Sequence, residues 1–201
     1  MTAVSTTAMT REAHEIPTLI HLNGPTGVGK STLAAALVRE RHLALNLDID
    51  ELRVRLGQWE STDDSKRVAR HLGFELARRH LHAGYDVVMP QLIVSVNVIH
   101  EIGAVARSAG AEYCQVLLVA STEELVARLG VDGPHVEPHP RNLFDLDTLA
   151  SQIAYTLEVV PELATADAVS TVVDVGGLSA PQALAAVRVA LPDCPPVGRN
   201  N

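Results

Sequence analysis

Apolar and polar positions along the chain form two kinds of stretch that alternate with each other. Short apolar runs of strand length occur at 18–22, 43–47, 86–89, 113–119 and 171–175. Between them lie amphipathic stretches that we interpret as helices, at 31–41, 64–83, 98–109, 123–129, 147–160 and 180–191. This alternation predicts βαβ units with a mainly parallel five-stranded sheet, in one three-layer α/β/α domain.

Two stretches carry particular signals. In the longest predicted helix, Val68, Leu72, Leu76 and Leu81 recur near the helical period. Residues 130–142 hold two glycines and three prolines, so we expect a loop there. We interpret this loop as an appendage over the functional site.

The ends of the chain differ from its centre. Residues 1–16 are polar and lack the apolar region of a signal peptide, so we expect a disordered tail. Residues 192–201 are expected to form a second loose tail, which leaves one domain at 17–191. No apolar run approaches the length that spans a membrane. We therefore expect a cytoplasmic protein without a membrane partner.

The composition narrows the possible partners. Apolar residues make up 47% and aromatic residues only 3%, so the core is expected to consist of Ala, Leu and Val. The chain has 16 basic and 24 acidic residues and a net charge of −8, which would repel a phosphate-rich polymer. We therefore expect no nucleic-acid partner, although a local basic cleft could still hold a small anion.

One octapeptide, GPTGVGKS, fits the pattern G-x-x-x-x-G-K-[ST] and lies between the first predicted strand and the first predicted helix. Glycines let the backbone curl around an anion, and its N–H groups and the helix N-terminus then point at the phosphates. We expect a loop that binds ATP or GTP; the alternative is a plain glycine turn. The residues of this nucleotide site are Gly24, Pro25, Thr26, Gly27, Val28, Gly29, Lys30, Ser31 and Thr32.

Three residues of this loop have expected individual roles. Lys30 would bridge the β and γ phosphates, and the Ser31 hydroxyl would bind Mg²⁺. Thr32 would either cap the helix or contact the α-phosphate. The chain has no guanine-specific N-K-x-D sequence, which favours ATP over GTP.

An acidic pair, Asp48 and Asp50, follows the second predicted strand, at the edge where open parallel sheets bind ligands. One carboxylate could accept a proton from a substrate hydroxyl that attacks the γ-phosphate, and the other could hold Mg²⁺ through water. The alternative for each residue is that it only caps the next helix.

The end of the third predicted strand lacks the acid that many such proteins use to hold Mg²⁺ through water. The run there is VVMPQ, and Asp86 lies at the other end of the strand. The outer shell of the metal is therefore expected to depend on Asp48 or Asp50, and Gln91 to contact substrate or a water.

Several larger side chains are further candidates. Of Arg53 and Arg55, at most one is expected to face the cleft and bind substrate. Trp59 either stacks on a substrate or packs in a half-buried position. Arg128 and Arg141 could contact the γ-phosphate as charge spreads in the transition state, and a solvent-exposed position is the alternative for both.

The motifs HLNGPTGVGKST, LDIDELR and STEELVARL, in this order, resemble the P-loop small-molecule kinases related to chloramphenicol phosphotransferase and zeta toxin. Within that group, VVMPQLIV and QVLLVASTEELVARL look most like the tunicamycin-resistance ATP-binding proteins. The resemblance spans roughly residues 18–191. It implies a kinase-like P-loop NTPase fold with strand order 2-3-1-4-5. It also implies a hydroxyl-bearing small molecule as acceptor, Asp50 as base, and a lid at 130–142 with Arg128 or Arg141 as lid arginine.

Motifs and resemblance together predict an ATP- and Mg²⁺-dependent phosphotransferase that acts on a small molecule, such as an antibiotic or a nucleoside-like compound. One alternative is a nucleotide-dependent sequestering protein with little phosphoryl transfer, which the missing strand-three acid favours. Another is a nucleotide or metabolite kinase of primary metabolism. The sequence leaves the acceptor open, and also the choice between a monomer and a homodimer.

Overall fold

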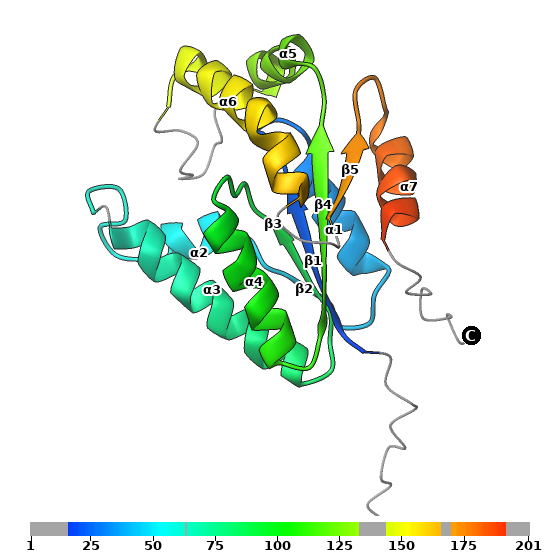
Figure 1. The fold of residues 1–201 in the computed structure, drawn as a ribbon. Coiled ribbons are helices and arrows are strands. Elements are labelled where there is room, and N and C mark those ends of the chain that lie inside the picture. The colour runs from blue at the N-terminus through cyan, green and yellow to red at the C-terminus, as the bar shows by residue number, and fades with distance from the viewer. Residues whose placement is uncertain (1–15, 63, 133–143, 166–169, 192–201) are drawn as a thin grey trace, which may run out of the picture.

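The computed structural model describes residues 16–62, 64–132, 144–165 and 170–191, with backbone only for 130–132. Its strands are β1 (Thr18–Asn23), β2 (Leu45–Asn46), β3 (Val87–Pro90), β4 (Glu112–Val119) and β5 (Ser170–Asp174). Neighbouring strands are all parallel, in the order β2-β3-β1-β4-β5 (Figure 1). The predicted five-stranded parallel sheet and its order are confirmed.

Helices cover both faces of the sheet. They are α1 (Lys30–Arg39), α2 (Ile49–Val54), α3 (Asp64–His82), α4 (Val96–Ser108), α5 (Thr122–Asp132), α6 (Leu146–Thr165) and α7 (Ala180–Ala190). One core joins the sheet to α1, α5, α7 and the first half of α6, and a second core on the opposite face joins it to α2, α3 and α4 (Figure 1). The predicted three-layer α/β/α architecture is confirmed.

β1 is the central strand, and it is buried at all six positions. Leu19 belongs to the core beneath α3 and α4, whereas Ile20 and Leu22 belong to the core beneath α1, as the two-residue period of a strand requires. The residues that follow β1 therefore emerge at the middle of the sheet's carboxyl edge. None of the helices in the described ranges combines the length and hydropathy needed to cross a bilayer.

Three predicted boundaries are wrong. The second strand is only two residues long, because Leu43 has a φ of 52° and is exposed. Helix α5 continues to Asp132, so the first three residues of the expected loop at 130–142 are helical. Helix α6 continues past Pro161 to Thr165. Leu163 is 1% exposed, and burying it against the sheet offsets the cost of a proline within a helix.

Helix α3 buries a different face from the one its large apolar residues mark. Its buried positions are Ser65, Ala69, Gly73, Ala77 and Leu81, whereas Val68, Leu72 and Leu76 are exposed. A Cβ on Gly73 would lie 3.1 Å from Cγ1 of Ile49, so small residues let α2 pack closely on α3. This contact positions α2, which carries part of the candidate site.

Candidate functional site

The loop between β1 and α1 turns through glycines in left-handed conformations. The φ angle is 138° at Gly24, 83° at Gly27 and 99° at Gly29. A Cβ on Gly24 would lie 2.3 Å from the carbonyl oxygen of Leu118 on β4, so a side chain there would collide with backbone. The chain therefore curls tightly against the sheet edge before it enters α1.

Lys30 begins α1, and its side chain folds back over this loop. Its Nζ donates to the carbonyl oxygens of Gly24 and Pro25, both at 2.9 Å. Burial lowers the pKa of Lys30 to about 8, although the nearby carboxylates of Asp48 and Asp50 raise it. The ammonium group therefore already lies where the loop would surround an anion.

The N-terminus of α1 is open to an anion. Among the described residues, no side chain caps it, and its first turn contains no acid. The first N–H groups of a helix have no acceptor within the helix, and the helix dipole favours negative charge there. Ser31 and Thr32 are exposed at this end. The loop and helix thus provide N–H groups, an ammonium and two hydroxyls at one point, which is the set that binds a polyphosphate.

Asp48 and Asp50 lie at the turn between β2 and α2. Oδ1 of Asp48 accepts hydrogen bonds from the backbone N–H groups of Asp50 at 2.9 Å and Glu51 at 3.4 Å. Asp48 is therefore the N-cap of α2, as one of the two interpretations of this residue predicts. Burial, followed by the charge of Asp50, raises the pKa of Asp48 to about 6.

Gln91 connects the end of β3 to this acidic turn. Its Nε2 donates to Oδ2 of Asp50 at 3.2 Å, and its Oε1 accepts from the backbone N–H of Ile49 at 3.2 Å. Because both ends of the amide are engaged, Gln91 orients Asp50. Asp86 lies at the other end of β3, as expected, and there it forms an ion pair with Arg41 at 2.6 Å.

A buried polar network holds the segment after β3 against β1. His21 contacts the carbonyl oxygen of Gln91 through Nε2 at 2.9 Å and the hydroxyl of Tyr113 through Nδ1 at 3.1 Å. Asn23 donates to the carbonyl oxygen of Ile93 at 2.8 Å and accepts from its N–H at 3.0 Å. Burial lowers the pKa of His21 to about 4, so its ring is neutral at neutral pH. This network fixes the backbone from which Gln91 reaches Asp50.

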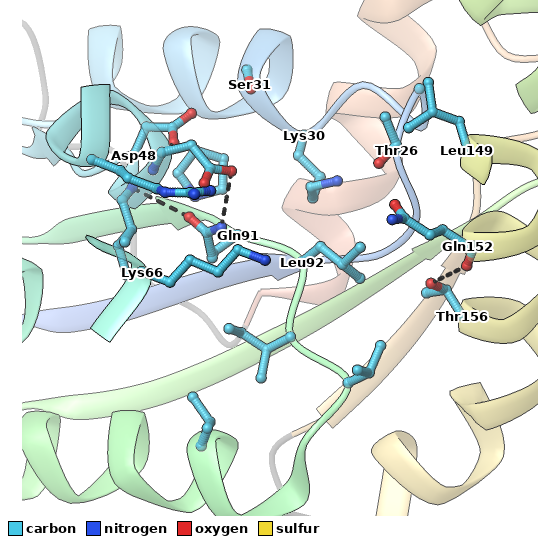
Figure 2. Close-up of a pocket in the computed structure, with 18 of the residues that line it drawn as sticks. Thr26, Lys30, Ser31, Asp48, Lys66, Gln91, Leu92, Leu149, Gln152 and Thr156 are labelled. Atoms are coloured by element: carbon cyan, nitrogen blue, oxygen red, sulfur yellow. Dashed lines mark hydrogen bonds between the residues drawn. The ribbon is translucent and has the colours of Figure 1, made fainter. Parts of the chain in front are cut away.

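Lys30, Asp48, Asp50 and Gln91 line one pocket of about 710 Å³. Figure 2 shows Lys30 between Asp48 and Gln91 on one side and Gln152 and Thr156 of α6 on the other. The structure therefore brings together the predicted residues of the phosphate loop, the acidic turn and strand three. The predicted residues that line this pocket are Thr26, Gly27, Gly29, Lys30, Ser31, Thr32, Asp48, Asp50, Arg53 and Gln91.

Arg53 is the one of the two neighbouring arginines that lines the pocket, whereas Arg55 is exposed. The Arg53 side chain is 6% exposed and its guanidinium lies 5.2 Å from the centre of the Trp59 ring. Its Nε donates to Oγ of Ser65 at 2.9 Å, and that hydroxyl donates to the carbonyl oxygen of Trp59 at 2.8 Å. Two roles were expected for Trp59, stacking on a substrate or packing. The structure shows packing, because the ring lies against the guanidinium of Arg53.

Arg128 lies on the other side of the phosphate loop. It lines a second pocket of about 570 Å³, together with Gly27, Gly29 and Thr32. Its guanidinium forms an ion pair with Glu124 one turn earlier on α5. The structure does not bring Arg128 together with Asp50. Arg141 and residues 133–142 of the expected lid lie outside the described residues, as do most of the expected tails.

Two walls of the main pocket were not predicted from the sequence. Lys66 and Arg70 line it from α3, and Leu149, Gln152, Tyr155 and Thr156 line it from α6. The sequence held one indication of the α3 wall. Lys66 is the only lysine besides Lys30 in an acidic chain, which could have marked it as a residue with a role at the site. The α6 residues carry no motif, and only the fold reveals them.

A parallel sheet in this order, with a phosphate-binding loop between its first strand and first helix, defines a P-loop protein with the kinase-like α/β fold. A family model described as an AAA domain matches residues 19–131, more than half of the chain, and the chain belongs to this family of P-loop proteins. No curated protein sequence matches the chain significantly.

Solved structures with the same fold include three that match nearly the whole chain. A kinase candidate from Chloroflexus aurantiacus is 19% identical with a TM-score of 0.66, covering 89% of this chain and 100% of the other. The tunicamycin resistance protein of Deinococcus radiodurans is 21% identical with a TM-score of 0.58, covering 90% and 99%. A gluconokinase from Sinorhizobium meliloti is 20% identical with a TM-score of 0.57, covering 88% and 95%. These likenesses confirm the fold.

Proposed function

We propose that the protein is an ATP- and Mg²⁺-dependent phosphotransferase that moves the γ-phosphate to a hydroxyl of a small molecule, such as an antibiotic or a nucleoside-like compound. One observation carries the proposal. The phosphate loop with Lys30 and the acidic turn with Asp48 and Asp50 line the same pocket, which extends beyond the loop far enough for a second molecule.

The residues present fit the nucleotide and the metal. The loop curls as a polyphosphate cradle does, and a Cβ on Gly29 would meet nothing within 4 Å, so the space beside it is open. The hydroxyl of Ser31 and the carboxylate of Asp48 are the oxygen donors that Mg²⁺ prefers, with Asp48 acting through water. When bound, Mg²⁺ would neutralise part of the negative charge of the phosphates.

In the proposed reaction Asp50 is the general base. Its Oδ2 is held by Gln91, and its Oδ1 has no hydrogen-bond partner among the described residues, so Oδ1 can accept a proton. The transfer forms a bond between the acceptor oxygen and the γ-phosphorus and breaks the bond from that phosphorus to the bridging oxygen. ADP is released, and the hydroxyl proton passes to Asp50. Lys30 stabilises the phosphate charge throughout.

The second pocket is the proposed place for the nucleoside end of ATP. It adjoins Gly27 and Gly29 and is lined largely by small and apolar residues, such as Val175 and Leu178. Arg128 and Arg141 remain proposed phosphate-contacting residues, the former on α5 and the latter in the segment that follows it.

A coupled assay of ADP release across hydroxylated small molecules tests the proposal. Acceptor-dependent ADP release is expected, and Asp50→Asn should lower kcat by roughly 10²–10⁴-fold while nucleotide affinity is retained. Nucleotide binding without stimulation by any acceptor would count against a phosphotransferase.

A sequestering protein is the second candidate, because β3 ends at Pro90 and is followed by Gln91 rather than by an acid. ATP labelled at the γ-phosphate separates the two functions. Label recovered on the acceptor would exclude sequestration, and retention of all label on the nucleotide would favour it.

A further inference from the structure

Charge is distributed unevenly around the main pocket. Lys30 lies at the phosphate loop, and three further cations, Arg53, Lys66 and Arg70, lie on the side formed by α2 and α3. The carboxylates of Asp48 and Asp50 line the same side, so four cations stand against two acids. The opposite side, formed by residues 90–95, Val98 and α6, carries no charged side chain among those that line the pocket. In a chain with a net charge of −8, this local excess of positive charge needs a reason.

Arg53 is built into the wall and faces the pocket. Its side chain is more than nine-tenths buried and is held by Ser65 and Trp59, yet only its Nε has a hydrogen-bond partner among the described residues. Arg53 lines the pocket, and neither of its two terminal nitrogens is hydrogen-bonded to a described residue, so both can donate to a bound ligand. A buried guanidinium with free donors is a site for an anion.

Lys66 and Arg70 extend this site along α3. They are four residues apart, so they lie on one face of the helix, and like charges at this spacing destabilise a helix unless an anion lies between them. Neither forms an ion pair within the described part of the chain, whereas the adjacent Arg67 pairs with Asp64. Figure 2 shows the Lys66 side chain directed toward Gln91 and Leu92, into the pocket.

We propose that the phosphate acceptor carries an anionic group, a carboxylate or a phosphate, that binds Arg53, Lys66 and Arg70 while its hydroxyl lies beside Asp50. This inference rests on the phosphotransferase function proposed above. Asp50 and Arg53 are three residues apart on α2, and both line the pocket, so they share one face of that helix. An acceptor held by Arg53 would therefore present a nearby hydroxyl to Asp50.

Pairs of acceptors that differ only in the anionic group test the inference. Sugar acids are compared with the corresponding sugar alcohols, and sugar phosphates with the corresponding sugars, so that the two arms distinguish carboxylate from phosphate. Kd is measured by calorimetry with a non-hydrolysable ATP analogue present, and kcat/KM by ADP release. The anionic member of at least one pair should bind and react more than tenfold better.

Lys66→Gln and Arg70→Gln should each raise Kd and KM for the anionic member roughly tenfold to a hundredfold, with nucleotide affinity unchanged. Arg67→Gln is the matched control, since its side chain is exposed and outside the pocket, and it should change neither constant. The inference would be overturned if the anionic and the neutral acceptor of each pair had equal Kd values. It would also be overturned if Lys66→Gln and Arg70→Gln weakened binding of the anionic and the neutral acceptor equally. If no acceptor stimulates ADP release, the phosphotransferase function falls, but the Kd comparison still decides whether the pocket selects an anion.

Discussion

At the scale of single residues, the phosphate loop depends on one ammonium group held close to the backbone. The Nζ of Lys30 donates to two loop carbonyls, those of Gly24 and Pro25. These contacts keep the cation inside the curl, so little side-chain entropy remains to be lost when phosphates bind.

Lys30→Ala should therefore weaken ATP binding at least tenfold, because it removes the loop's cation and a charge-assisted contact to the phosphates. Equilibrium binding of a fluorescent ATP analogue measures the change. Lys66→Ala is the matched comparison, and it should bind ATP as the parent protein does. Unchanged affinity in the Lys30 variant would contradict a nucleotide site at this loop.

Asp50 shows how far single residues could be predicted. Its place after the second strand marked it as a candidate base, and the structure places it in the pocket with Lys30. The partner that orients it, Gln91, is 41 positions away in sequence. Only the parallel pairing of β2 with β3 brings the two together, so no local pattern could have revealed the contact.

At the scale of elements, helices were recognised more reliably than the faces they bury. The spacing of Val68, Leu72 and Leu76 correctly predicted a helix, but the buried stripe of α3 is the small-residue one that includes Ala69 and Gly73. Close packing of α2 on α3 decides the face, and a hydrophobic pattern contains no information about that partner. The same limit applies to α6, where burial of Leu163 carries the helix past its proline.

Gly73→Leu should destabilise the protein by about 1–3 kcal/mol, because a larger side chain cannot fit against Ile49 without displacing α2. Urea denaturation measures the loss. Since α2 carries Asp50 and Arg53, activity should fall as well. Leu72→Gln, one position away on the exposed face, should change the free energy of unfolding by less than about 0.5 kcal/mol. Equal losses in the two variants would refute this packing argument.

At the scale of the whole molecule, the sheet order explains why distant motifs form one site. With β1 in the centre, its carboxyl end lies beside that of β3, and β2 pairs with β3 in turn. The phosphate loop, Gln91 and the acidic turn therefore meet at one edge. The resemblance to P-loop kinases implied this strand order, whereas only the structure places the cationic residues of α3 at the pocket.

The stability of the folded molecule should depend on pH through His21. Its pKa is lowered from 6.5 to about 4 by burial, so the unfolded chain binds a proton in this window that the folded chain does not. Stability should therefore fall as the pH drops from 6.5 toward 4, by about 3 kcal/mol in total from this residue.

Urea denaturation at about pH 7 and about pH 4.5 measures this dependence. Other acidic groups also titrate there, so the His21→Asn variant serves as the reference. The variant should lose about 2–3 kcal/mol less than the parent protein between the two pH values. Parallel losses in both proteins would show that His21 does not titrate as proposed.

The placement of both lysines in one pocket has a practical consequence. An acylating reagent that modifies lysine amines has only Lys30 and Lys66 to react with, besides the chain's amino terminus. At mildly alkaline pH the pKa of Lys30, about 8, leaves much of its amine unprotonated and so able to react. Mass spectrometry of such adducts therefore provides a footprint of both ligands. Nucleotide should protect Lys30 from modification, and the acceptor should protect Lys66.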